Sequence, residues 1–138
     1  LKRYNPNIIQ VPANIFDQRF LSVKLLDRIN KKGIILYARS IFLQGLLLMN
    51  DIERPKFFEE WKSIFLQWDL FLTKNNLTKF QGAIYFINQC NNIQNVIIGI
   101  ESEIHLKKII KEIDKKTNIN FPKFDIINKD IINPRVWR

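Results

Sequence analysis

The pattern of hydrophobic and polar positions along the chain contains three short apolar runs, near residues 8–12, 34–40 and 96–100. Each run is rich in isoleucine, leucine or valine and is flanked by proline, glycine or asparagine. Short runs without a polar face are typical of β-strands that are buried on both faces. We therefore expect three buried strands at these places.

Between the runs, apolar residues recur at helical spacing. Val23, Leu26 and Ile29 predict a helix that starts near Ser22 and ends at Lys31-Lys32-Gly33, where cations and a left-handed glycine are favoured. A long amphipathic helix is expected after Pro55. Its inward positions are Phe57, Phe58, Trp61, Ile64, Phe65, Trp68, Phe71 and Leu72.

Two further helices are predicted from their N-cap residues, Thr78 and Ser102. Their inward positions are Phe80, Ala83, Ile84 and Ile87 in the first helix, and Leu106, Ile109, Ile110 and Ile113 in the second. Prolines limit helix formation after residue 117. We expect residues 117–138 to form an irregular tail that packs over the outside of the helices.

Alternating strands and helices predict a parallel α/β architecture in a single domain, residues 1–138. Ligands bind at the carboxyl ends of parallel strands, so Arg39 and Ser40, which end the second run, are candidate functional residues. Gln10 is a polar amide inside an apolar run. It either fills a core position with satisfied hydrogen bonds or points into a site, and the sequence pattern leaves both interpretations open.

The composition is that of a folded protein, since 46% of the 138 residues are hydrophobic and 12% are aromatic. Cys90 is the single cysteine, which excludes an internal disulfide and fits a reducing compartment. No run approaches the roughly 18 apolar residues of a membrane span. We expect a soluble, cytoplasmic protein without a membrane partner; the chain begins on Leu1 rather than Met, so we also expect further sequence upstream.

The net charge of +9 raises the question of nucleic-acid binding. The basic residues are scattered, however, and doublets such as Lys107-Lys108 and Lys115-Lys116 fall where a helix presents a solvated face or its last turn. We therefore expect a solvated basic surface and no nucleic-acid partner.

Three segments, in the same order, resemble the last three strands and loops of the aldo/keto reductase family. They are Ile9-Gln-Val-Pro-Ala-Asn-Ile-Phe-Asp-Gln-Arg19, Gly33-Ile-Ile-Leu-Tyr-Ala-Arg-Ser-Ile-Phe-Leu-Gln-Gly-Leu-Leu47 and Val96-Ile-Ile-Gly-Ile-Glu-Ser102. The resemblance covers nearly the whole chain. A complete (β/α)8 TIM barrel needs about 250 residues. The resemblance therefore implies the C-terminal portion of such a barrel, strands six to eight with their helices.

Members of that family transfer hydride between NADPH and a carbonyl compound. The resemblance implies that this chain is the cofactor-holding part of such an oxidoreductase, with a small-molecule carbonyl substrate. The family's catalytic Asp, Tyr, Lys and His lie on the first four strands, so no catalytic residue is assigned here. The chain alone is expected to be inactive, and its partner would be the missing N-terminal half of the barrel.

The resemblance also implies which residues bind the nicotinamide. Gln10 matches the glutamine that binds the carboxamide. Arg39 stands where members carry an aromatic residue or an arginine against the nicotinamide ring, and a planar guanidinium can stack there.

The remaining cofactor positions would contact the phosphates. Ser40 and the loop through Phe42 to Gly45 would border the pyrophosphate, and Gly99, Ser102 and His105 would hold the adenosine phosphate. Gly99 stands where many members carry a basic residue for the 2′-phosphate, and Ile109 replaces the asparagine of the adenine contact. The implied cofactor is NADP, with NAD as the alternative.

Other interpretations have less support. A non-catalytic or truncated barrel relative would bind a nucleotide or a protein instead, and the upstream sequence would discriminate the two classes. No His or Cys lies at metal-ligand spacing from His105, so we expect no metal. A Cys90–His105 nucleophile pair and a hydrolytic Ser40 have no supporting motif.

A partial barrel has one physical consequence. Three parallel strands leave their edges unpaired and one sheet face uncovered, where the other strands would close the barrel. We expect the chain by itself to aggregate, dimerise or remain partly molten.

Overall fold

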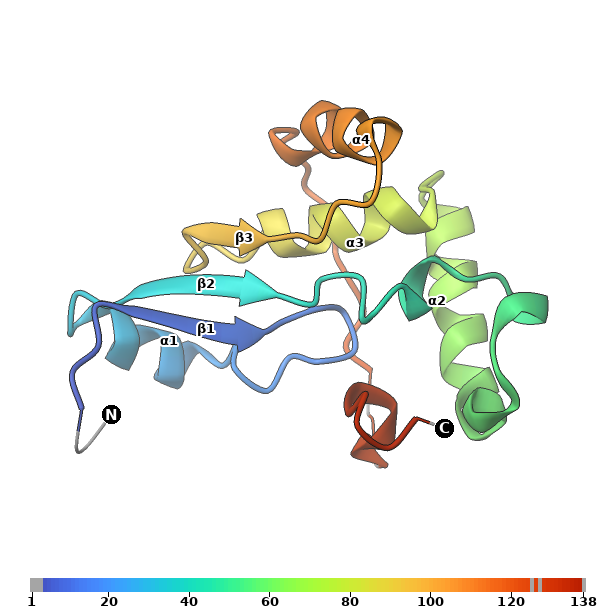
Figure 1. Cartoon of the computed structure of the whole chain (residues 1–138), viewed down its shortest axis with the longest axis horizontal. Coiled ribbons are helices and arrows are strands. Elements are labelled where there is room, and N and C mark those ends of the chain that lie inside the picture. Colours follow the sequence, from blue (N-terminus) through green and yellow to red (C-terminus); the bar gives the residue numbers. More distant parts are fainter. Residues whose placement is uncertain (1–3, 125, 127, 138) are drawn as a thin grey trace.

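The computed structural model describes residues 4–124, 126 and 128–137 (Figure 1). Its elements are β1 (Ile8–Pro12), α1 (Val23–Asn30), β2 (Ile35–Arg39), η1 (Leu46–Leu48), η2 (Asp51–Glu53), η3 (Lys56–Trp61), α2 (Lys62–Lys74), α3 (Lys79–Asn88), β3 (Asn95–Ile97), α4 (Glu103–Ile113) and η4 (Lys129–Ile132), where η denotes a 3-10 helix. Leu1, and Asp125, Ile127 and Arg138 of the predicted tail, lie outside the described residues.

The three strands form one parallel sheet in the order β1-β2-β3, as predicted. Ile8 lies opposite Ile35, and Tyr37 lies opposite Asn95. The third strand, Asn95–Ile97, is shorter than the predicted range 96–100. It ends early because β2, its partner, ends at Arg39: Ser40 has φ 59°, and this left-handed conformation turns the chain out of the sheet.

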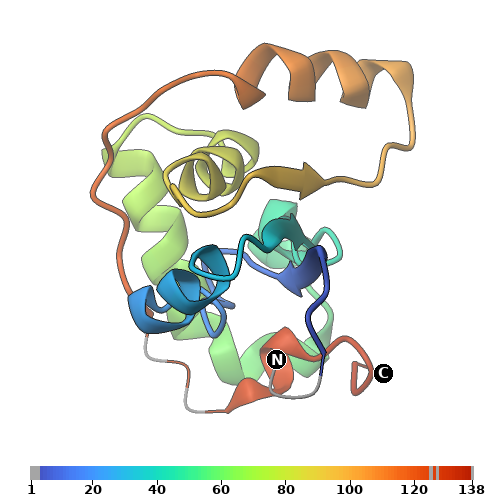
Figure 2. The ribbon, with the colours of Figure 1, turned by 90° about the vertical axis from the view of Figure 1, so that its left-hand side faces the viewer.

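Helices cover only one face of this sheet. Leu36 and Ala38 on the covered face are fully buried, and Figure 2 shows α1 and α3 on the same side of the strands. On the opposite face, Ile8, Ile35 and Ile97 are 46%, 40% and 41% exposed. The prediction of strands buried on both faces is therefore wrong, because the described helices pack on a single face.

We call the uncovered surface the open face. By strand alternation and register it consists of Ile8, Gln10, Pro12, Ile35, Tyr37, Arg39, Asn95 and Ile97. This uncovered face is the one expected for a partial barrel. Gln10 is exposed there, so the interpretation of a buried core amide is wrong.

The long aromatic helix is confirmed on its inward face and differs at its start. Residues 56–61 form the 3-10 helix η3, and the α-helix begins at Lys62. Every predicted inward position is buried or half-buried. Phe65 lies at the centre of this layer and meets the rings of Phe16 and Phe58 edge-on.

The N-caps of the next two helices are confirmed, and the inward face of α4 is confirmed at Ile109, which is buried, and Ile113, which is half-buried. Thr78 Oγ1 accepts from the Gln81 N–H at 3.2 Å, and Ser102 Oγ accepts from the His105 N–H at 3.2 Å. Two other residues that were expected to face inward, Leu106 and Ile110, are 37% and 61% exposed. They are exposed because α4 packs on α3 and stands away from the sheet (Figure 1).

The apolar spacing predicted for α1 is confirmed at Leu26 and Ile29, which are buried, but not at Val23, which is 73% exposed. Among the described residues, no helix has both the length and the apolar composition needed to cross a membrane.

The tail contributes to the core rather than only covering the helices. It runs irregularly from α4 to η4 along the side of α3 and α2 (Figure 2). Phe124 meets the rings of Phe16 and Trp68 edge-on, and Ile131 and Ile132 of η4 are buried in the main hydrophobic cluster. The prediction that the tail only covers the outside of the helices is therefore wrong, because Phe124, Ile131 and Ile132 pack into the main hydrophobic cluster.

Candidate functional site

The loop that follows β2 has an unusual backbone. Ser40, Leu43, Gln44 and Gly45 have φ values of 59°, 49°, 54° and 85°. Residues other than glycine rarely adopt this left-handed conformation, and such strain concentrates at functional sites. Buried Leu43 holds the loop against the core, and its N–H donates to the Ser40 carbonyl at 2.9 Å.

A buried amide on the loop after β1 supports this conformation. Asn14 is 1% exposed, and its Nδ2 donates to the Ser40 carbonyl at 3.0 Å. Its Oδ1 accepts from the N–H groups of Phe16 at 3.0 Å and Asp17 at 2.8 Å. Asn14 therefore ties the two loops together while satisfying three buried backbone groups.

The same loop contains a bidentate ion pair. The Asp17 carboxylate is 1% exposed and accepts from Arg19 Nε and Nη2, both at 2.8 Å. The hydrogen bond that Arg19 donates to Asp17 raises the pKa of the guanidinium. This pair fixes the loop that carries Asn14.

A cavity of about 550 Å³ opens at the carboxyl ends of β2 and β3. Six of the eight residues predicted to bind the cofactor line it, namely Arg39, Ser40, Phe42, Gly45, Gly99 and His105. Arg39 Nη1 donates to Ser40 Oγ at 3.2 Å, and the guanidinium stays exposed at the mouth. The fold thus brings together residues that lie up to 66 positions apart in the sequence.

An aromatic wall separates this cavity from a second one of about 750 Å³. Phe42 stacks on Phe80 with ring centroids 5.3 Å apart, and His105 lies 6.1 Å and 5.9 Å from these two rings. Phe42 lines the first cavity, Phe80 lines the second, and His105 lines both. The two adjoining cavities therefore meet at the imidazole of His105.

The second cavity contains most of the nearby charge. Lys79, Lys108 and Lys111 line it, together with the α4 N-cap Ser102. Glu101 lines both cavities and is exposed. The buried Glu112 also lines this cavity, so its lining carries both signs of charge. The three lysines outnumber the two carboxylates, and with the N-terminus of α4 they favour an anionic group here.

Two predicted site residues lie outside the first cavity. Gln10 is on the open face, opposite Tyr37 of β2, and Ser102 lines the second cavity. Ile109, which stands at the family's adenine-contact position, is 6% exposed and packs inward.

Asn14 and Phe80 were not predicted from the sequence as parts of the candidate site, although Asn14 contacts Ser40 and Phe80 contacts Phe42. Phe80 was expected only as a core residue, and its contact with Phe42 depends on how α3 packs. Asn14 had a usable signal, because a single amide between apolar neighbours after a strand is a common Asx-turn residue.

The alternative chemistries gain no support from the structure. Burial raises the pKa of the Cys90 thiol to about 11, so it is protonated at neutral pH, and its Sγ lies 3.4 Å from the Phe86 carbonyl. Among the described residues, no group of three His, Cys, Asp or Glu side chains is arranged to hold a metal ion.

Comparisons with known proteins show a similarity of fold. No family model and no curated protein matches the chain. The structure is similar to that of the glycerol dehydrogenase AKR11B4 from Gluconobacter oxydans, an aldo/keto reductase, with a TM-score of 0.50 and 16% sequence identity. The match covers 83% of this chain and 46% of the other, so the chain spans about half the length of that protein. At this identity the similarity concerns the fold, a mixed α/β chain consistent with part of a barrel.

Proposed function

We propose that this chain is the cofactor-holding part of an aldo/keto reductase-like oxidoreductase that transfers hydride between NAD(P)H and a carbonyl substrate. The observation that carries the proposal is the single cavity lined by Arg39, Ser40, Phe42, Gly45, Gly99 and His105. These residues were matched to the cofactor positions from the sequence, and they converge at the carboxyl ends of parallel strands, where barrels bind ligands.

The donor groups of Arg39 and Ser40 and the two adjoining cavities suit a nicotinamide dinucleotide. When bound, the cofactor supplies the hydride. The Arg39 guanidinium would lie against the nicotinamide ring, and the left-handed loop from Ser40 to Gly45 would border the pyrophosphate. The two adjoining cavities, which share Leu48, Glu101 and His105, would hold the two halves of the dinucleotide.

We propose NADP as the cofactor, with NAD as the alternative. Lys79, Lys108 and Lys111 line the second cavity and would attract the additional phosphate of NADP. Lys79 is engaged by Asp69, whereas Lys108 and Lys111 extend from α4. The 2′-phosphate would therefore lie close to α4.

A cofactor titration tests this proposal. Arg39→Ala should weaken NADPH binding by about fivefold, because a stacked guanidinium contributes about 1 kcal/mol. The fold should be unchanged, since Arg39 is exposed. Binding is measured by NADPH fluorescence, with Arg28→Ala, an exposed arginine of α1, as the matched control.

Three outcomes are informative. NADPH binding that Arg39→Ala leaves unchanged would refute the role of Arg39, and absence of NADPH and NADH binding would refute the cofactor cavity. NADPH binding without oxidation by simple carbonyl compounds is expected for the chain alone, because the proposed acid and base residues lie upstream. If an upstream segment proves to lack those residues, the chain is a nucleotide-binding relative without catalysis.

A further inference from the structure

One lysine of the second cavity is neutralised by a carboxylate from another helix. Lys79, the first residue of α3, lines the cavity, and its ammonium pairs with the Asp69 carboxylate of α2. Asp69 lies outside the described lining of both cavities. The Lys79 side chain is 19% exposed and that of Asp69 is 31% exposed, so water screens this ion pair only in part. Lys79 therefore adds little positive charge to the cavity.

Arg54 holds the Asp69 carboxylate in place. Arg54 Nη2 donates to Asp69 Oδ2 at 3.1 Å and to the Met49 carbonyl at 3.0 Å. The Arg54 side chain is 6% exposed, and its guanidinium lies 4.1 Å from the centroid of the Phe65 ring. Lys79 pairs with the other carboxylate oxygen, Oδ1. Because each oxygen of Asp69 has its own cation, the carboxylate is fixed against Lys79.

The remaining charges of the second cavity balance each other. Besides Lys79, the described lining has two lysines and two carboxylates, namely Lys108, Lys111, Glu101 and Glu112. The positive excess of the lining is therefore the charge of Lys79, and Asp69 neutralises it. The attraction of the side chains for an additional phosphate is weaker than the number of lysines suggests.

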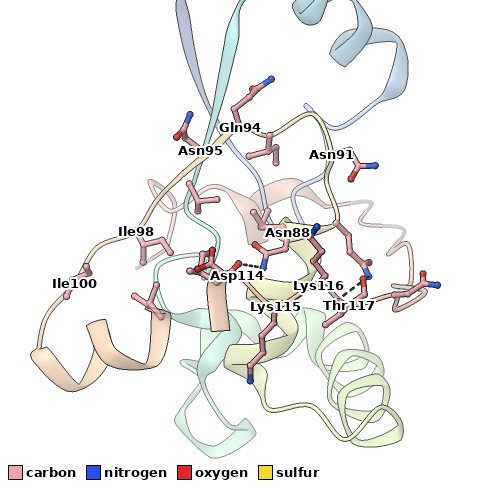
Figure 3. A pocket seen from close by; sticks show the side chains of 17 residues that line it. Asn88, Asn91, Gln94, Asn95, Ile98, Ile100, Asp114, Lys115, Lys116 and Thr117 are labelled. Carbon is pink, nitrogen blue, oxygen red and sulfur yellow. Dashed lines mark hydrogen bonds between the residues drawn. The ribbon is translucent and has the colours of Figure 1, made fainter. Parts of the chain in front are cut away.

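The lysines on the two helices keep fixed relative positions, because α4 is held to α3 (Figure 3). Asn88 Nδ2 donates to the Ile113 carbonyl at 2.6 Å, at the end of α4. Gln89 Nε2 donates to the Thr117 carbonyl at 2.8 Å, just beyond that helix. The α4 lysines and Lys79 thus line one preformed cavity, in which a change of charge at Lys79 acts on a ligand held by α4.

We propose that Asp69 determines the cofactor specificity of the second cavity: by neutralising Lys79, it keeps the preference for NADPH over NADH small. This inference rests on the proposed function, since it concerns the cavity assigned to the 2′-phosphate. Without the charge of Asp69, the Lys79 ammonium would pair with that phosphate instead. Asp69 acts through Lys79 and is therefore a positioning residue, not a catalytic one.

The test compares the dissociation constants of NADPH and NADH, measured by fluorescence titration of the whole chain at neutral pH. Asp69→Asn keeps an oxygen that can accept from Arg54 and removes the charge. It should tighten NADPH binding by about fivefold and leave NADH binding unchanged, because only NADPH has the 2′-phosphate. Asp69→Ser also removes the charge and should give the same gain.

Three further variants separate the role of Asp69 from a structural one. Asp69→Glu keeps the charge and should bind both cofactors as the wild type does. In a Lys79→Met background, Asp69→Asn should no longer tighten NADPH binding, because the two residues act as a pair. Asp27→Asn removes a carboxylate from an exposed position on α1 and should change neither dissociation constant.

Several results would overturn the proposal. They are an unchanged or smaller preference for NADPH in both Asp69→Asn and Asp69→Ser, an equal gain for NADPH and NADH, or a gain that persists in the Lys79→Met background. Each of them can occur while the cofactors bind, so the proposed function would stand. Absence of NADPH and NADH binding to the wild type would instead refute the proposed function, and this inference with it.

Discussion

At the scale of single residues, Asn14 connects two loops of the candidate site. Its side chain closes the turn after β1 and holds the Ser40 carbonyl, so two loops depend on one buried amide. Removing the Asn14 side chain would leave the Phe16 and Asp17 N–H groups without this acceptor, whereas the Ser40 carbonyl would keep the Leu43 N–H. Each buried group left without a hydrogen bond costs about 1–3 kcal/mol. Asn14 therefore links the stability of the fold to the shape of the cavity beside Ser40.

We predict that Asn14→Asp distorts the cavity while keeping the turn after β1. The carboxylate still accepts from Phe16 and Asp17, but it cannot donate to Ser40 and repels that carbonyl. NADPH affinity should fall by about tenfold, and stability by about 2 kcal/mol, in a fluorescence titration and a urea denaturation. Asn120→Asp, at an exposed asparagine, is the control; equal behaviour of the two variants would contradict the prediction.

Gly82 tests how tightly α2 and α3 pack. A Cβ atom at this position would clash with the Leu72 side chain and lie 2.9 Å from Trp68 Cη2. We predict that Gly82→Ala destabilises the chain by about 1–2 kcal/mol, because overpacking outweighs the gain of about 1 kcal/mol in helix propensity.

The midpoint of urea unfolding measures this change. Gly99→Ala is the control, since a Cβ atom added there would meet no atom within 4 Å and the φ of Gly99 is not left-handed. A stabilised Gly82→Ala variant would contradict this prediction, because it would show that the interface between α2 and α3 can accommodate a Cβ atom.

At the scale of elements, α4 is attached through a small polar cluster. The buried Glu112 carboxylate accepts from the Tyr85 hydroxyl on α3 and from Lys115 Nζ at 2.9 Å. The hydrogen bond from Tyr85 lowers the pKa of Glu112 below its ordinary value of 4.5. The charged carboxylate thus stabilises the docking of α4 on α3.

We predict that acid releases α4. Because the folded-state pKa of Glu112 is lowered, the unfolded state binds more protons as the pH falls below 4.5. The stabilisation is complete above that value and is lost as the pH falls through the folded-state pKa. Glu112→Gln should lose about 1–2 kcal/mol at about pH 7 and show a flatter acid dependence.

Amide hydrogen exchange along α4, with urea unfolding across the acid range, measures this effect. Glu103→Gln is the control, because its carboxylate is 77% exposed and pairs with Lys107 within the same helix. An identical pH profile for wild type and Glu112→Gln would contradict the role of Glu112.

At the scale of the whole molecule, the open face dominates the expected behaviour. The exposed isoleucines Ile8 and Ile35 lie opposite one another on β1 and β2, and Ile97 on β3 is exposed opposite Arg39, farther along β2. Such a surface favours association between molecules. The same surface would face the interior of a closed barrel, where its apolar side chains would be buried.

We predict that the chain self-associates through the open face. The double variant Ile8→Thr/Ile35→Thr should be more monomeric, because threonine keeps strand propensity while removing apolar surface. Sedimentation velocity measures the change. Ile52→Thr is the control, since Ile52 is 96% exposed on η2, away from the sheet. A monomeric, cooperatively unfolding wild type would show that the open face is stable in water.

Several elements could be predicted from the sequence because their signals are local. The apolar runs, the N-caps Thr78 and Ser102, and the aromatic spacing each depend on residues within one or two turns of one another. The candidate site was predicted as a set of residues through family resemblance. Its convergence on one cavity was not contained in any local pattern, because Ser40 and His105 meet only through packing.

The sequence by itself determined which segments become strands and helices, because propensity and periodicity act within a segment. Tertiary structure alone decided which face of each strand is buried, since Ile35 and Leu36 are equally apolar and only Leu36 lies beneath a helix. It also decided the left-handed backbone of Ser40, which depends on the distant amide of Asn14. Burial and long-range hydrogen bonds depend on what packs nearby, and a local pattern does not contain that information.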